Sequence, residues 1–594
     1  MSPPRSWKTS LRVYSLATLL GLVVLVLAFR LWEADLTVPF NYSNGGDVHF
    51  HLMLFKTIGE TGWFLVNPQL GAPGVMDLHD FPYIETGMAL LVKGMTAFTD
   101  DPFLIANLYV LATFLFVLWA SLYALRQLGA SEAVALTASL LFAFAPYHLW
   151  RGATHPHLSS YFSVPLAVLV ALWLCQGEPL LVERSRGGPW RAGPRGRVVA
   201  ALVTAALIAL GGPYYGLFGT YLLATGGLIG WLRRPTRARA LNAALLVGLI
   251  VACFAAQLVP FWLYWQRHGA NPVASFRPVN AVLLLGLRFR YLLRPVAGHR
   301  LSWLVDPNLE KLQARVGNVL HLYDETYNEA SLTAPLGLVA GLGFLTLLVV
   351  VLAWPIRAFR GVPWLKDLAA LNLAALFLAQ SGGLGELIAL NLTTKIRAYN
   401  RMSIVIAFLA LAGLAMLATR WRARRPSGRW FPFVLGLVLV LGLLDQVPPA
   451  ALPDYRRDAA QFRSDREFVG RIEAAVPPGS MIFQLPPNSF PEFGIHIEMP
   501  DYSLFRGYLH SSHLQWSYGA LRGREVERWQ SRLAPLPVPE LVDELRAANF
   551  AGLYVNRRGH ARRAEVLEQE LTRALGGPLF VSRDGQLSFF RLAP

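Results

Sequence analysis

Long apolar stretches separated by short polar connections dominate the first three quarters of the chain. An α-helix needs about 20 apolar residues to cross a bilayer. The pattern therefore predicts a mainly α, polytopic membrane protein with about eleven transmembrane helices. The predicted spans are 12–32, 103–126, 130–149, 160–176, 198–213, 215–232, 240–264, 333–354, 364–381, 402–419 and 430–448.

Two of these spans need comment. The apolar core of the first, Val13 to Phe29, is long and is not followed by a small-x-small cleavage site, so we expect a retained helix and not a cleaved signal peptide. The fifth and sixth spans are separated only by Gly211-Gly212-Pro213. A re-entrant hairpin is the alternative there.

The distribution of Lys and Arg predicts the orientation. Basic residues precede the first span and follow the second, fourth, sixth, eighth and tenth. Because cytoplasmic loops carry the excess of Lys and Arg, the N-terminus is expected in the cytoplasm. Three large segments then lie outside, namely 33–102, 265–332 and 449–594. Long connections of this kind are uncommon without a function.

The last of these segments is polar and long enough for a small domain. We therefore expect a transmembrane domain over 1–448 with two large external loops, followed by an extracytoplasmic α+β domain over 449–594. Its predicted strands are Met481–Leu485 and Gly552–Val555, and its predicted helices are Arg463–Ala475 and Val538–Ala548.

Composition narrows the class of protein. Of the 594 residues, 54% are hydrophobic and only 15% are charged, whereas a soluble domain is about 25% charged. This excludes a disordered chain and an ordinary soluble enzyme. The net charge of +17 would also suit nucleic acid, but 17 Trp and 34 Phe in apolar runs argue against such a partner. Cys175 and Cys253 lie in apolar stretches and suggest neither a disulfide nor a metal cluster.

The first external loop holds the main candidates for chemistry. Ionisable groups beside a membrane domain are costly and suggest function, and a carboxylate just beyond the first span can act as a general base toward a hydroxyl. A solvated loop also needs polar residues, so each residue alone fits either interpretation. The candidates are Asp47, Asp77 and Asp80 for catalysis, and His49, His51, Lys56 and His79 for substrate binding.

A divalent metal is a further alternative for this loop. The histidines at 49, 51 and 79, together with Asp77, are suitable ligand types. Their spacing matches no specific metal signature, so no metal ligand is assigned.

The short turn 146–162 borders the bilayer and contains three histidines and an arginine. An aromatic belt explains its Tyr and Trp residues. The histidines fit two interpretations equally, namely capping at the membrane interface and contact with a ligand. His148 and Arg151 are the substrate-binding candidates from this turn, which also contains His155 and His157.

Basic residues also occur where the positive-inside rule does not expect them. His299 and Arg300 lie in the second external loop, and Arg397 and Arg401 lie at the outer end of the tenth span. The planar guanidinium group suits phosphate oxygens, so a lipid-linked phosphate at the outer leaflet would be a matching partner. Snorkelling to lipid head groups is the alternative.

The whole pattern resembles the GT-C superfamily of integral-membrane glycosyltransferases, and in particular large bacterial membrane proteins described as sugar translocases or YfhO-like. The resemblance extends over nearly the whole chain, although GT-C members share layout more than sequence. It rests on Gly46-Asp47-Val-His49-Phe-His51, Asn67-Pro-Gln-Leu-Gly71-Ala-Pro73, Ala145-Pro-Tyr-His148, Leu293-Arg294-Pro-Val-Ala-Gly-His299-Arg300, Ile396-Arg397-Ala-Tyr-Asn-Arg401, Arg506-Gly-Tyr-Leu-His510 and Trp516-Ser-Tyr-Gly519.

The resemblance implies roles for some of these residues. Asp47 would be the base on the acceptor hydroxyl, Asp77 or Asp80 a second acidic position, and Arg397 and Arg401 the groups that stabilise the leaving lipid phosphate. The usual Asp-x-Asp pair is absent, and Asp77-Leu-His79-Asp80 stands in its place. Metal use therefore stays open.

The expected function is transfer of a sugar from a polyprenyl-phosphate donor to an extracytoplasmic glycan or lipid, in the bacterial cytoplasmic membrane. A flippase for a lipid-linked saccharide and a non-catalytic envelope assembly factor are the alternatives. For the C-terminal domain, acceptor recognition and a buried aromatic core both fit the residue types at Arg506, Tyr508, His510, His513, Trp516 and Tyr518.

Overall fold

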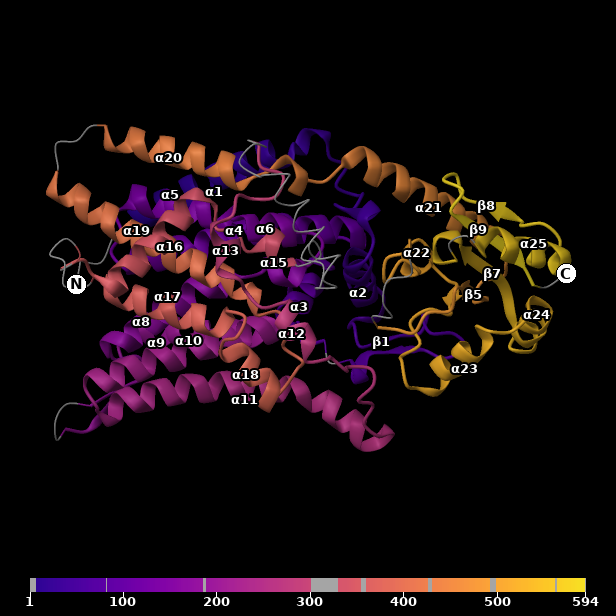
Figure 1. The fold of residues 1–594 in the computed structure, drawn as a ribbon, viewed down its shortest axis with the longest axis horizontal. Coiled ribbons are helices and arrows are strands. Elements are labelled where there is room, and N and C mark those ends of the chain that lie inside the picture. The colour runs from indigo at the N-terminus through magenta and orange to yellow at the C-terminus, as the bar shows by residue number, and fades with distance from the viewer. Residues whose placement is uncertain are drawn as a thin grey trace, which may run out of the picture.

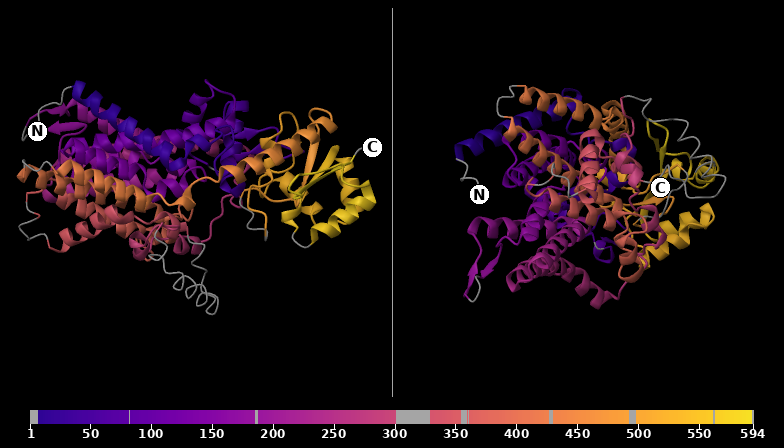
Figure 2. Two further views of the ribbon diagram at one scale, coloured as in Figure 1. Left: turned by 90° about the horizontal axis from the view of Figure 1, so that it is seen from above. Right: turned by 60° about the vertical axis from the view of Figure 1, so that its left-hand side comes forward.

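The structure is a computed structural model. It describes residues 7–81, 83–184, 188–300, 329–353, 359, 361–425, 430–491, 498–560 and 563–592. A bundle of long helices lies at the N-terminal end of its long axis, and an α/β region lies at the C-terminal end (Figure 1). Two further views show the same division (Figure 2).

Each of the eleven predicted apolar stretches contains a helix of the bundle. The apolar surfaces of α1 and α11 are largely exposed, as expected of helices that face lipid, whereas α8 and α19 are buried among the others. The helices are α1 (Trp7–Phe29), α4 (Pro102–Gln127), α5 (Glu132–Ala143), α8 (Ser163–Gln176), α9 (Arg195–Leu210), α10 (Gly212–Arg233), α11 (Arg237–His268), α16 (Gly337–Leu352), α17 (Leu365–Ala379), α19 (Ser403–Arg424) and α20 (Phe431–Gln446).

Length and composition single out fewer spans than the sequence predicts. In the described part of the chain, 5 helices qualify, or up to 6 if the pair formed by Phe431–Gln446 and Pro449–Ala475, bent by 63°, is one span. The chain is thus a multi-pass membrane protein, and the count of about eleven stays a prediction. The five are Ser10–Phe29, Pro102–Gln127, Glu132–Arg151, Arg237–His268 and Tyr399–Arg424.

Short elements cover the end of the bundle that faces the α/β region, and β3 (Val182–Arg184) pairs with β4 (Trp190–Ala192) in a separate hairpin. The first external loop supplies η1 (Leu31–Glu33), η2 (Tyr42–Asn44), α2 (Asp47–Thr61), β1 (Val66–Asn67), β2 (Met76–Asp77), η3 (Leu78–Asp80) and α3 (Thr86–Met95). Later segments supply α6 (Pro146–Arg151), α7 (Pro156–Ser159), α12 (Asn280–Leu284), α13 (Phe289–Leu293), α15 (Glu329–Thr333), α18 (Leu384–Asn391), η6 (Tyr399–Met402) and η7 (Pro449–Ala451).

The C-terminal part is built on a five-stranded mixed sheet with the strand order β6-β5-β7-β9-β8. Strand β5 is parallel to β6 and β7, whereas β9 is antiparallel to β7 and β8. The strands and helices predicted here are confirmed. They are α21 (Tyr455–Ala475), β5 (Met481–Leu485), α22 (Phe505–Leu509), β6 (Gln515–Trp516), α23 (Glu525–Leu533), α24 (Val538–Ala547), β7 (Phe550–Asn556), η8 (Arg557–Gly559), α25 (Ala564–Leu575), β8 (Phe580–Val581) and β9 (Leu587–Arg591).

The first external loop packs directly on this sheet. One face of the sheet shares a hydrophobic core with α2 and α21, and the other face packs on α24 and α25. Backbone hydrogen bonds join the loop to strand β6, from Trp516 N to Gln69 O (2.8 Å) and from Ala72 N to Trp516 O (3.0 Å). The loop is therefore held between the bundle and the α/β region.

Candidate functional site

Asp47 begins helix α2 at the junction of the two parts. Gly45 and Gly46 precede it with φ of 69° and 59°, a backbone conformation that favours glycine. The Asp47 carboxylate accepts a 2.9 Å contact from His155 Nε2, and 42% of its side chain remains exposed. Burial opposes ionisation, but the positive charge and hydrogen bond of His155 outweigh it, so the pKa of Asp47 is lowered. The carboxyl group is therefore accessible, and its pKa is held down by His155.

Two further histidines extend the site. His51 lies one helical turn after Asp47, and its Nδ1–H donates to the Asp47 carbonyl (2.7 Å). Its Nε2 then accepts from the Tyr83 hydroxyl (2.9 Å) and lies 2.9 Å from His157 Nδ1. Burial lowers the pKa of His51 to about 4. His51 is thus a neutral ring that links α2 to the turn around His155.

A half-buried carboxylate joins two arginines beside these histidines. Arg151 NH1 lies 2.9 Å from Glu329 Oε2, and Arg401 Nε lies 3.5 Å from Glu329 Oε1. Although burial opposes ionisation, the charges of Arg151 and Arg401 hold the pKa of Glu329 well below its usual range. The Arg401 guanidinium also lies 4.1 Å from the centre of the Tyr214 ring. Two guanidinium groups share one carboxylate, which leaves excess positive charge.

The arginine pair and Asp47 belong to one electrostatic neighbourhood. Arg401 is close enough for its charge to lower the pKa of Asp47, and His155 acts on both Asp47 and Glu329. Helices α2, α3, α6 and α15 meet where the bundle joins the α/β region (Figure 1). The structure therefore places Asp47 within electrostatic reach of Arg401, although 354 positions separate the two residues in the sequence.

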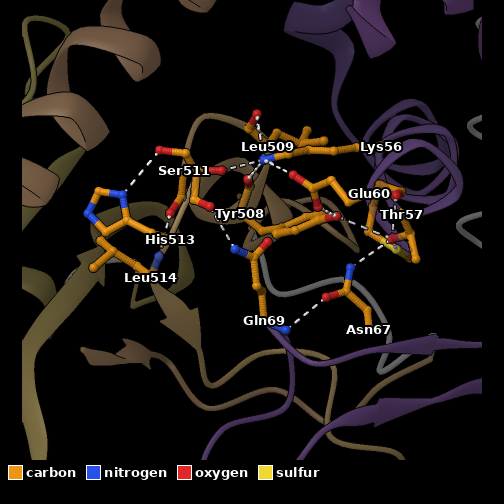
Figure 3. Close-up of polar contacts among 12 residues, drawn as sticks. Lys56, Thr57, Glu60, Asn67, Gln69, Tyr508, Leu509, Ser511, His513 and Leu514 are labelled. Carbon is orange, nitrogen blue, oxygen red and sulfur yellow. Dashed lines mark hydrogen bonds and ion pairs between the residues drawn. The ribbon is translucent and has the colours of Figure 1, made fainter. Parts of the chain in front are cut away.

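Lys56 occupies a different place. Its ammonium group donates to the backbone carbonyls of Tyr508 (2.6 Å) and Ser511, and it lies 3.6 Å from Glu60 Oε1 (Figure 3). Burial lowers its pKa. Because its ammonium group donates hydrogen bonds to carbonyls at and just after the end of helix α22, Lys56 ties α2 to the α/β region.

His49 also faces away from Asp47. Its ring packs against Tyr42 at 4.9 Å, and neither ring nitrogen has a hydrogen-bond partner. Burial lowers its pKa to about 3. Next to it, the Tyr42 hydroxyl lies 2.8 Å from both Asp465 and His510, and Asp465 pairs with Arg506. His49 thus belongs to the contact between the loop and helix α21.

The two other acidic candidates lie in structural contacts. Asp77 caps η3 and pairs with His79 at 2.6 Å. The fully buried Asp80 accepts two hydrogen bonds from Arg524, of 2.6 and 2.8 Å, and one from Asn271. These contacts connect η3 to α11 and the α/β region. The assignment of Asp77 and Asp80 as catalytic residues stays a prediction.

The remaining candidates lie at helix ends. His148 is buried, stacks on Phe114 and lies 3.0 Å from Thr113 Oγ1, as a core histidine would. His299 Nε2 lies 3.2 Å from Asp445, and Arg300 donates to the carbonyls at the end of helix α20. Arg397 is half-buried and precedes η6. Their predicted roles in substrate binding are not tested by these contacts.

Two further predictions concern a metal site and the aromatic residues of the C-terminal part. Among the described residues, no three His, Cys, Asp or Glu side chains are grouped to hold a metal ion. Trp516, Tyr508 and Tyr518 are buried in the core between the loop and the sheet, which favours the core interpretation over sugar stacking.

Sequence reasoning did not assign His155, His157, Tyr83 or Glu329 to the site. Helical periodicity could have separated the candidates of the first loop into two groups. Residues 47 and 51 share one face of a helix, whereas 49 and 56 share another. No comparable signal predicts Glu329, because its partners Arg151 and Arg401 are distant in sequence.

Comparisons with known proteins address the fold. The family described as a domain of unknown function, DUF6311, matches residues 87–275. No curated protein matches the sequence. The arabinofuranosyltransferase AftD from mycobacteria is similar in structure, with a TM-score of 0.50 and 14% identity over 98% of this chain and 40% of AftD. The chain thus spans about two fifths of AftD.

Two other solved structures are similar at lower scores. ArnT from Cupriavidus metallidurans, bound to undecaprenyl phosphate, has 12% identity, a TM-score of 0.45 and 98% coverage of both chains. The oligosaccharyltransferase AglB from Archaeoglobus fulgidus has 13% identity and a TM-score of 0.44 over 98% of this chain and 74% of AglB. The match to AftD shows that the chain has a GT-C-like membrane fold.

Proposed function

We propose that this protein transfers a sugar from a polyprenyl-phosphate donor to a hydroxyl of an extracytoplasmic glycan or lipid. The observation that carries the proposal is that Arg401, in the Arg151–Glu329–Arg401 bridge, lies within electrostatic reach of the Asp47–His155 pair. A transferase of this kind needs a base for the acceptor and a cationic site for the phosphate. Both lie in one neighbourhood, and the GT-C-like fold is consistent with the reaction.

The reaction follows from these groups. Asp47 takes the proton of the acceptor hydroxyl, and the acceptor oxygen forms the new bond to the anomeric carbon. The bond from that carbon to the phosphate oxygen breaks, and its electron pair stays on the phosphate. Arg401 and Arg151 stabilise the phosphate, and the untested Arg397 is the further predicted contact. A single displacement inverts the anomeric configuration.

Location follows from the same proposal. The site would face the outer leaflet of the bacterial cytoplasmic membrane, with the N-terminus in the cytoplasm and the region 449–594 outside. In these steps the guanidinium groups supply positive charge to the phosphate.

The test is the substitution Asp47→Asn. Proteoliposomes that contain the purified protein and undecaprenyl-phosphate-linked labelled sugars should form product with wild type. The variant should lose about 100-fold or more in rate, since it lacks the base, while membrane insertion persists. Asp100→Asn, an exposed acid of the same loop, is the matched control and should keep full activity. Full activity of Asp47→Asn would remove Asp47 from the mechanism, and movement of the lipid-linked sugar without product would favour a flippase.

A further inference from the structure

The break between α9 and α10 accommodates a carboxyl group from the first loop. A Cβ added to Gly212, which has a φ of 80°, would lie 2.0 Å from Glu85 Oε2. A Cβ added to Gly87 would lie 2.6 Å from the carbonyl oxygen of Leu210. The start of α3 therefore packs without space against the junction of the two helices. Only glycine at 212 leaves room for the Glu85 carboxyl.

This carboxyl group is buried and has no partner. Glu85 is 6% exposed, and among the described residues no hydrogen bond or ion pair reaches its oxygens. Burying a polar group without a hydrogen-bond partner destabilises a fold, so a role in binding a ligand would account for its position. The carboxyl points at the first turn of α10, a 22-residue helix whose N-terminal N–H groups favour anions.

The neighbours of Glu85 connect it to the candidate site. The positive charge of Arg401, in η6, favours ionisation of Glu85. Tyr83 and Tyr109 of α4 also lie within electrostatic reach of Glu85. Tyr83 in turn donates to His51 beside Asp47. Burial raises the pKa of Glu85 well above its ordinary value, although Arg401 opposes this. Burial therefore favours the protonated form of the carboxyl group, which can donate a hydrogen bond.

The groups around Glu85 indicate which kind of ligand would bind there. Arg401 and the N-terminus of α10 attract an anion, and a protonated carboxyl donates to it, whereas an ionised carboxylate would repel it. Tyr214, in the same first turn of α10, lies under the Arg401 guanidinium. The three groups together match a phosphate ester, which offers several acceptor oxygens in one place.

We propose that the Glu85 carboxyl group donates a hydrogen bond to the phosphate of the polyprenyl donor, in a subsite formed with Arg401 and the first turn of α10. This inference rests on the proposed function for the identity of the lipid. During transfer, the sugar–oxygen bond breaks and its electron pair stays on the phosphate. Glu85 shares its proton with that phosphate through a hydrogen bond and keeps it, while Asp47 takes the proton of the acceptor. No further reactant is needed.

Binding of undecaprenyl phosphate to the full-length protein in detergent tests the subsite. Glu85→Gln keeps a neutral donor at the same position, so its affinity should lie within about 3-fold of wild type, whereas Glu85→Leu should bind about 10-fold more weakly or worse. Glu33→Leu, at an exposed position of the same loop, is the matched control and should bind like wild type. Inorganic phosphate at equal concentration should not displace the lipid.

Three results would overturn the proposal. Tighter binding by Glu85→Gln would mean that Glu85 is ionised and repels the phosphate. Wild-type affinity in Glu85→Leu would remove the contact, and displacement by equal inorganic phosphate would contradict the lipid assignment. If Glu85→Leu does not fold, as judged by thermal unfolding, Glu85→Asp replaces it and should bind more weakly than Glu85→Gln, because its carboxyl is withdrawn by one methylene. Equal affinity of Glu85→Asp and Glu85→Gln for the lipid would also overturn the proposal.

Failure of the proposed function would look different. In that case wild type would transfer no sugar, whereas the binding order of wild type, Glu85→Gln and Glu85→Leu would still decide the subsite. Transfer that depends on Asp47 but not on Glu85 would retain the function and remove the subsite.

Discussion

At the scale of single residues, the neighbours of each carboxyl group in the candidate site determine its pKa. Asp47 and Glu85 are carboxyl groups of one loop with opposite pKa shifts. His155 lowers the pKa of the Asp47 carboxyl, whereas burial raises the pKa of Glu85 well above its ordinary value. Two carboxyl groups in different protonation states can serve as base and donor at the same pH. The distinction comes from their neighbours, because both side chains have similar intrinsic acidity.

His155 is expected to set the acid limit of activity. Asp47 must be ionised to act, and its lowered pKa keeps it ionised below the range of an ordinary aspartate. In His155→Gln the positive partner is lost, so the pKa of Asp47 rises and activity should disappear at a higher pH than in wild type. The pH dependence of sugar transfer measures this. His513→Gln, on the α/β region, is the control, and an unchanged acid limb in His155→Gln would contradict the assignment.

At the scale of elements, helix α21 holds the segment that leads to Asp47. The Asp458 carboxylate accepts from Asn41 N, Ser43 N and Ser43 Oγ at 2.9, 2.9 and 2.7 Å. These residues form the turn before Gly45 and Gly46. Because α21 follows α20 across a bend of 63°, the bundle and the α/β region both determine where α2 begins.

We therefore expect Asp458→Ala to affect stability and activity together. Loss of a buried carboxylate with three hydrogen bonds should lower the free energy of unfolding by about 2–3 kcal/mol, and transfer should fall because Asp47 is less well placed. Unfolding in detergent and the transfer assay measure the two effects. Asp543→Ala, at an exposed position of α24, should change stability by less than about 0.5 kcal/mol. Wild-type behaviour of Asp458→Ala would show that α21 does not hold the turn.

At the scale of the whole molecule, the first loop joins the bundle to the α/β region. Asp80 and Arg524 form the most buried of its ion pairs, and Arg524 also donates to the carbonyls of His268 and Gly269 at the end of α11. Three segments distant in sequence meet at this contact. The pair is therefore expected to couple the parts of the protein energetically.

A double-mutant cycle tests that coupling. Asp80→Asn, Arg524→Gln and the double variant should give an interaction energy of about 2 kcal/mol, because Asp80 is fully buried. The exposed pair Arg583 and Glu467 is the control and should give about 0.5 kcal/mol or less. Additive effects at Asp80 and Arg524 would mean that the two parts are held together by other contacts.

Much of this architecture could be predicted from the sequence. Apolar stretches predicted where the bundle helices lie, since a helix in lipid satisfies its own backbone and needs only an apolar surface. The strand Met481–Leu485 was predicted with its bounds, because a short apolar run between turn signals is typical of a buried strand. Asp47 was predicted from its place just beyond a span. All of these are local properties of the chain.

The tertiary structure decided which polar residues work together. Lys56 and Asp80 are ionisable residues of the same loop as Asp47, yet they bind the α/β region. His49 packs against Tyr42 within the loop. Arg401 meets its partner Glu329, and Glu85 packs against Gly212, only in the folded chain. Protonation and pairing depend on burial and on charges from remote segments, which no local pattern contains. The sequence by itself determined a many-helix membrane protein with polar external segments, and only folding determined which of those polar groups share one site.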